Sequence, residues 1–221
     1  MNRMKTYDVP HKGIRNALSQ LALLAGNTDY SNHHEVEKLY QLGNEVFRIL
    51  TIHANDENDI SLAELENLQS GASKHDRDEH ITLHKLQNHL EELLFSIFSE
   101  SNEGKDCGEK GSEFYFLLNE FYGKYLLHIA EEESVTQLLL WKHFTDQELA
   151  GHRVKIMGKH PPETLFLWFK FVIPAQNHQE RVGLLSGFKK MAPVPFFNQG
   201  MEVIQKVLTE NEYQKLMIAL N

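Results

Sequence analysis

Apolar residues recur at intervals of three and four along most of the chain, and few segments alternate with a period of two. This spacing is typical of amphipathic helices and not of strands. Four long helices are expected, over residues 9–25, 34–59, 73–98 and 112–144. The sequence therefore predicts an all-α fold.

Polar breaks separate these helices. Gly26 and Asn27 are residues that commonly end helices, and residues 99–112 form a polar loop with several glycines. After residue 144, the pairs Thr145/Glu148 and Thr209/Glu212 have the spacing of capping boxes. We expect three or four shorter helices there. The predicted organisation is a helical bundle over residues 1–150 and a C-terminal helical extension over 151–221, packed on the bundle.

The composition indicates which classes of partner and which compartment suit the protein. With 41% hydrophobic and 24% charged residues, the chain has the composition of a soluble globular protein. Its formal charge of -9, with no dense cluster of Lys and Arg, argues against nucleic acid or a membrane as a partner and suits a cationic ligand. The chain has no signal-like start and no apolar segment long enough to span a bilayer, which favours the cytoplasm.

Cysteine usage restricts any metal chemistry. Cys107 is the only cysteine, which excludes an intrachain disulfide and a zinc site made of thiolates. Any metal ion must therefore be held by histidines and carboxylates.

Four sets of such residues lie on the four long predicted helices. Residues four apart on a helix lie on one face, roughly 6 Å apart, so that each pair can approach a metal ion from one side. The sets, one on each helix in order, are His11; His53 with Glu57; His80 with His84; and His128 with Glu132 or Glu133.

Symmetry about the predicted turns places these sets at matching heights. If consecutive helices form antiparallel hairpins, residues equidistant from a turn lie side by side. The midpoint of His11 and His53 is Asn32, and the midpoint of the third and fourth sets is Asp106; both lie in predicted breaks. The four sets are therefore expected to meet in the bundle core.

A buried group of imidazoles and carboxylates without an ion would cost about 1 to 3 kcal/mol for each unsatisfied group. We therefore interpret the sets as a metal site, and the remaining histidines as ordinary surface or hydrogen-bonded residues. Mixed imidazole and carboxylate ligands favour iron, although zinc or another divalent metal is an alternative. Seven candidate ligands are more than one ion needs, which indicates two metals. The Glu-x-x-His motif of ferritin-like di-iron proteins does not occur in the chain.

The order H, HxxxE, HxxxH, HxxxE, with HANDEN at residues 53–58 and HIAEEE at 128–133, resembles the hemerythrin-like (HHE cation-binding) family over residues 8–150. The resemblance implies an antiparallel up-down-up-down four-helix bundle around a non-haem di-iron centre. The centre would bind oxygen or sense iron, oxygen or redox state. The resemblance also implies a set of metal ligands, namely His11, His53, Glu57, His80, His84, His128 and Glu132. Glu57 and Glu132 would be bridging carboxylates, and Glu133 stays open as an alternative to Glu132.

Other functions remain open at this point. A di-iron oxidase, or an enzyme that consumes peroxide or nitric oxide, would use the same ligands, and a metal-free helical interaction module would use none. The tail is similar in layout to the helices that follow hemerythrin domains in plant iron-sensing ubiquitin ligases, but the chain lacks the cysteines of a RING. The aromatic residues of 166–171 either pack the extension onto the bundle or form a surface for a protein partner.

Overall fold

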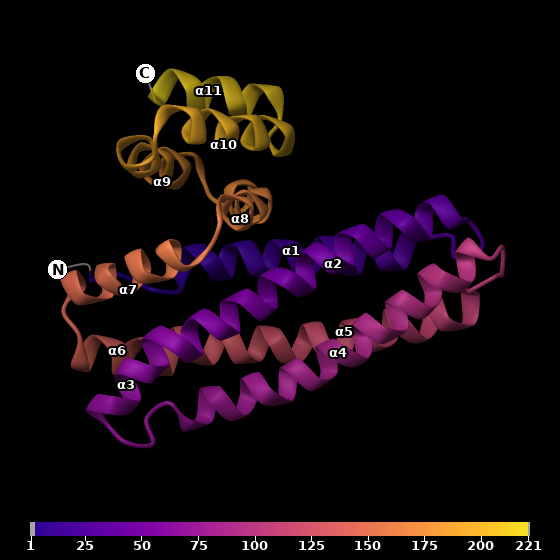
Figure 1. The fold of residues 1–221 in the computed structure, drawn as a ribbon, viewed down its shortest axis with the longest axis horizontal. Helices are drawn as coiled ribbons and strands as arrows, with labels where there is room; N and C mark the ends of the chain where they lie inside the picture. The colour runs from indigo at the N-terminus through magenta and orange to yellow at the C-terminus, as the bar shows by residue number, and fades with distance from the viewer. Residues whose placement is uncertain (1–2, 221) are drawn as a thin grey trace.

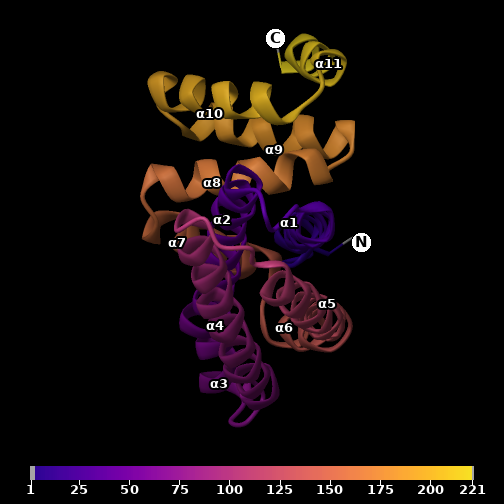
Figure 2. The ribbon, with the colours of Figure 1, turned by 90° about the vertical axis from the view of Figure 1, so that its right-hand side faces the viewer.

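The computed structural model describes residues 3–220, and within that range every regular element is a helix and none is a strand. The predicted all-α class is confirmed. The four longest helices are α1 (Asp8–Asn27), α2 (His33–Asp56), α4 (Lys74–Asn102) and α5 (Gly108–Glu131). Helix α1 packs against α2 and α5, and α4 packs against the same two helices (Figures 1 and 2). The four long helices thus form a closed ring of neighbours.

The turns at one end of these helices lie where the sequence places them. Asn32 precedes α2, and its side chain accepts a hydrogen bond from the backbone N–H of His34, which caps the helix. The turn between α4 and α5 contains Asp106, and Gly104 adopts a φ of 78°, a conformation that favours glycine. Both predicted midpoints therefore lie in turns.

At the opposite end, two of the long helices continue through π-helical turns that the sequence pattern did not predict. Helix α2 ends at Asp56, close to the predicted end near residue 59, and is followed by the π-turn η1 (Glu57–Ser61) and α3 (Leu62–Leu68), which the sequence did not predict. Helix α5 is followed by η2 (Glu132–Thr136) and α6 (Gln137–His143). A π-turn contains an additional residue and often occurs at a functional site. Each of these two begins at one of the predicted bridging glutamates.

The long helices enclose an apolar core. Its inward residues follow the three-and-four spacing of their helices, and the turn end is filled by aliphatic and aromatic side chains. Fully buried members include Ile14, Leu18, Leu21, Val36, Leu39, Ile97, Phe114 and Leu118.

Up to residue 220, the last one described, five helices follow, where three or four were predicted. They are α7 (Asp146–Lys159), α8 (Pro162–Ala175), α9 (His178–Met191), α10 (Val194–Val207) and α11 (Glu210–Leu220). Both predicted capping boxes, Thr145/Glu148 and Thr209/Glu212, make their reciprocal hydrogen bonds. No helix within the described residues is long and apolar enough to cross a membrane.

Helix α8 joins the long helices to α9–α11 (Figures 1 and 2). It lies along α1, where a Cβ atom on Gly13 would come within 2.6 Å of Val172 Cγ2. Phe171 is buried in the core of the long helices, whereas Phe169 is buried against α9–α11. Helix α8 therefore contributes to both cores, and no break in packing separates the long helices from it. The predicted boundary at residue 150 stays a prediction.

Candidate metal centre

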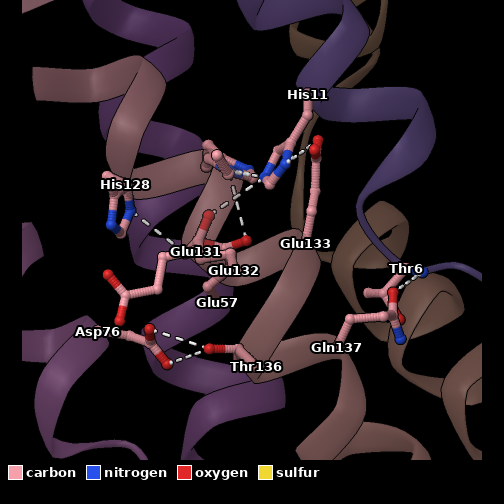
Figure 3. Close-up of polar contacts among 12 residues, drawn as sticks. Thr6, His11, Glu57, Asp76, His128, Glu131, Glu132, Glu133, Thr136 and Gln137 are labelled. Carbon is pink, nitrogen blue, oxygen red and sulfur yellow. Dashed lines mark hydrogen bonds and ion pairs between the residues drawn. The ribbon is translucent and has the colours of Figure 1, made fainter. Parts of the chain in front are cut away.

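Six ionisable side chains are buried together at the end of the long helices where the π-turns lie. Each of the four long helices supplies a histidine, and each π-turn supplies its first residue, a glutamate. No side chain in the set is more than 7% exposed. Figure 3 shows Glu57 and Glu132 between His11 and His128. The six are His11, His53, Glu57, His80, His128 and Glu132.

The four histidines form two pairs. The Nε2 atoms of His11 and His53 are 3.1 Å apart, and the rings of His80 and His128 lie edge to face with centroids 4.8 Å apart. This is the pairing that the midpoints at Asn32 and Asp106 predict. The hairpin geometry therefore brings the sets of adjacent helices to one level.

Each glutamate lies between the two histidine pairs. Glu57 places Oε1 at 3.3 Å from His53 Nε2 and Oε2 at 3.3 Å from His80 Nε2. Glu132 places Oε2 at 3.2 Å from His11 Nε2 and Oε1 at 3.2 Å from His128 Nε2. Both carboxylates thus direct one oxygen to each histidine pair, which is how a carboxylate spans two cations.

Contacts at the opposite ring nitrogens fix three of the imidazoles. The Nδ1 atoms of His11, His80 and His128 lie at 2.9, 3.1 and 2.8 Å from side-chain oxygens of Glu133, Asn58 and Glu79. When Nδ1 carries the proton and donates it, Nε2 presents its lone pair to the interior, which is the form that binds metal ions. Of the two candidate glutamates at the end of α5, Glu132 thus faces the interior and Glu133 supports His11 from outside.

His84 does not join the cluster. It is exposed, and it lies outside the buried groups of ligand-type atoms found in residues 3–220. The buried positions of α4 alternate in steps of four and three, from His80 to Leu83 to Gln87. The inward position one turn after His80 is therefore Leu83, and the fourth residue faces solvent. We therefore correct the predicted HxxxH pair to His80 alone.

Burial and mutual charge set the ionisation of the centre. Burial, with the charge of Glu132, raises the pKa of Glu57 to about 7. Burial, with the charge of His11, holds the pKa of His53 well below its usual value, so this imidazole is neutral. Burial opposes the charge of Glu132, but the nitrogens of His11, His128 and His80, at 3.2 to 3.4 Å, outweigh burial and hold its pKa well below the usual range. The same contacts outweigh burial and raise the pKa of His11 to about 9 and of His80 to about 10, so without a metal ion protonated imidazoles balance the charge of Glu132.

Six donor atoms of this cluster lack a hydrogen-bond partner among the described residues. Both oxygens of Glu57 and of Glu132, and the Nε2 atoms of His80 and His128, are buried without a hydrogen bond. Each such atom costs about 1 to 3 kcal/mol when nothing binds it. Cations that accept these lone pairs remove the cost, and the donors are of the type that divalent metals prefer. The buried His/Glu cluster fits metal ions.

Several supporting residues escaped the sequence analysis. Asn58 is the last residue of the HANDEN motif but was given no role, and Glu79 adjoins His80, where a search for pairs four residues apart passes over it. Tyr7 has the spacing of the predicted pairs, four residues before His11, but it was not recognised because tyrosine is not among the expected ligand types. Trp168, from α8, places its ring edge-on to His53 with centroids 6.3 Å apart.

An all-helical chain that gathers these donors in its interior defines a helical cation-binding protein. A family model described as Hemerythrin HHE cation binding domain matches residues 3–138, which is more than half of the chain and includes all six buried side chains. The protein belongs to the hemerythrin HHE cation-binding family. Comparisons with curated proteins and with solved structures found no match.

Proposed function

We propose that this protein is a non-haem di-iron protein of hemerythrin type, which binds oxygen or senses iron, oxygen or redox state. The four long helices would be its antiparallel up-down-up-down bundle. His11 and His53 would hold one iron and His80 and His128 the other, with Glu57 and Glu132 as bridges. When bound, iron would supply reversible redox chemistry and a position for a small ligand.

The observation that carries this proposal is the position of the two carboxylates. Glu57 and Glu132 each direct one oxygen to each histidine pair, and all four oxygens are buried without a hydrogen-bond partner. A single zinc ion needs only four ligands and leaves the second histidine pair unused. Two ions bridged by carboxylates use every buried donor, and mixed imidazole and carboxylate donors suit iron.

The chain's own residues would hold and orient these donors. Glu133, Asn58 and Glu79 fix the imidazoles through Nδ1, and such outer contacts commonly change metal affinity 10- to 100-fold. The π-turns direct the glutamates inward at the ends of α2 and α5.

Metal stoichiometry tests the proposal directly. The purified protein is loaded with ferrous iron without oxygen and freed of unbound metal, and its iron content is measured by ICP. We expect two irons per chain in the wild type and fewer than one in His53→Ala. His84→Ala is the matched control, because it removes an exposed histidine of the same predicted set. A wild type that retains no iron would disprove the proposal.

Two further results would change the assignment of function. Sustained turnover of peroxide or nitric oxide by the iron-loaded protein would favour an enzyme over a binding or sensing protein. A melting transition unaffected by both iron and chelator would favour a metal-free interaction module. Optical spectra before and after exposure to oxygen separate oxygen binding from irreversible oxidation.

A further inference from the structure

Tyr7 lies directly beside the metal centre. It precedes α1, and its backbone carbonyl accepts the first hydrogen bond of the turn that carries His11, at 3.0 Å. The two rings are stacked, with centroids 4.9 Å apart and planes 19° from parallel. Tyr7 is only 2% exposed, so its ring is fixed by packing.

The hydroxyl of Tyr7 has no partner in the protein. It is one of the buried polar atoms without a hydrogen bond in residues 3–220. The charges that act on it are those of Glu57 and Glu132, followed by Asp76. The Asp76 carboxylate already accepts from Thr136 Oγ1 at 3.0 and 2.9 Å (Figure 3). The phenol is therefore stacked on one predicted ligand, His11, and its buried hydroxyl bonds to none of the carboxylates whose charges act on it.

A buried hydroxyl in this state needs an acceptor, because leaving a donor unsatisfied is as costly as breaking a hydrogen bond. The proposed centre provides one. Each iron would have two imidazoles and one oxygen from each glutamate, which are four protein atoms. Iron sites with imidazole and carboxylate ligands commonly keep further positions open for small ligands. A small ligand there has lone pairs to accept the proton of a neighbouring phenol.

We infer that the Tyr7 hydroxyl donates a hydrogen bond to the small ligand that occupies the centre, whether water, hydroxide or an added anion. Tyr7 is thus a positioning residue, which favours ligands that accept hydrogen bonds. A tyrosine phenol, whose pKa is ordinarily about 10, keeps its proton near neutral pH and can donate it in a hydrogen bond. This inference rests on the proposed iron centre and adds a determinant of its ligand preference.

Azide binding to the oxidised, iron-loaded protein tests this role. Azide is added to wild type, Tyr7→Phe and Tyr30→Phe, and binding is followed by optical absorption. Tyr30→Phe is the matched control, because its hydroxyl donates to the Ala25 carbonyl near the distant turn. We expect azide affinity to fall about tenfold to a hundredfold in Tyr7→Phe, as for loss of a hydrogen bond to a charged acceptor, and to stay unchanged in Tyr30→Phe.

A vibrational measurement separates hydrogen bonding from a merely structural effect. The stretching frequency of bound azide should shift in D2O in the wild type and in Tyr30→Phe, and the shift should disappear in Tyr7→Phe. Unchanged affinity and an unchanged D2O shift in Tyr7→Phe would overturn the inference. Loss of iron from Tyr7→Phe would also overturn it, since the hydroxyl would then serve metal retention. A wild type without iron would instead refute the proposed function.

Discussion

The metal centre and the C-terminal core are two buried clusters that the same chain completes in different ways. The C-terminal core, defined by the buried apolar residues of α8–α11, contains Phe169, Ile173, Leu185, Phe188 and Ile204. Its buried cation, Arg181, donates to the carbonyls of Ile173 and Pro174 and to Glu212. The metal centre contains six ionisable groups, and many of their inward atoms have no partner. The first cluster is complete as protein, whereas the second needs ions.

Removal of metal should produce the largest difference in stability between the two clusters. An ion held at a free concentration 1,000 times its Kd stabilises the folded state by about 4 kcal/mol. Chelation should therefore speed hydrogen exchange in the helical turns that carry His11, His53, His80 and His128 by several orders of magnitude. Exchange in α9–α11 should change little. Mass spectrometry of exchanged fragments checks this, and equal changes in both regions would contradict the contrast.

Truncation of an apolar residue in the C-terminal core should give the reverse pattern. Ile204 is fully buried there, and Ile204→Ala should cost about 2 to 4 kcal/mol from lost burial and the cavity left behind. Urea unfolding measures the loss, and ICP should find the iron content unchanged. Ile218→Ala, at a residue 76% exposed on α11, is the control and should be near neutral. Loss of iron from Ile204→Ala would show that the two clusters are coupled.

The sequence predicts most of the centre because its geometry depends on two regular properties. Residues four apart share a helix face, and equal distances from a short turn give equal heights. These two properties suffice to bring His11 beside His53 and His80 beside His128. They also fix the fold class, since the apolar spacing is helical throughout.

Two kinds of feature were not predicted from the sequence: departures from regular helical spacing, and contacts made by tertiary packing. The π-turns at Glu57 and Glu132 each add a residue, and a search for a period of 3.6 does not detect them. On α4 the inward face advances in alternating steps of four and three, which excludes His84. Tyr7 and Trp168 approach the centre through tertiary packing, and neither is a ligand type that a search for metal sites includes.

Loss of an outer carboxylate should weaken the centre without emptying it. Hydrogen bonds from His11 and Arg15 outweigh the effect of burial and lower the pKa of Glu133 to about 2, so it is anionic beside His11. Glu133→Gln keeps the size of the side chain but removes this charge, and should lower iron affinity about 10- to 100-fold. Competition with a chelator measures the affinity. Glu120→Gln, which affects only an exposed pair with Lys124, should leave it unchanged.

The smallest predicted effect lies in the C-terminal core, where the ion pair of Arg181 found within residues 3–220 is with the exposed carboxylate of Glu212. Hydrogen bonds from the Thr209 hydroxyl, Arg181 and the Thr209 backbone lower the pKa of Glu212 from 4.5 to about 2. Its side chain is 41% exposed, so solvent screening reduces the gain to about 0.5 to 1 kcal/mol. A carboxyl whose pKa is lowered by folding stabilises the folded state above its unfolded pKa. That contribution should be complete above about pH 5 and fade as the pH falls toward 2.

Glu212→Gln isolates the contribution of the Glu212 charge to stability, because the amide still accepts hydrogen bonds but carries no charge. Urea unfolding at pH 6 should find the wild type about 0.5 to 1 kcal/mol more stable than the variant. At pH 3 the gap should narrow, since Glu212 is then protonated in the unfolded chain while still ionised in the folded one. Acid effects on the metal centre are common to both proteins and cancel in the difference. A gap that stays constant from pH 6 to pH 3 would mean that the charge of Glu212, and with it the ion pair with Arg181, contributes nothing to the stability of the C-terminal core.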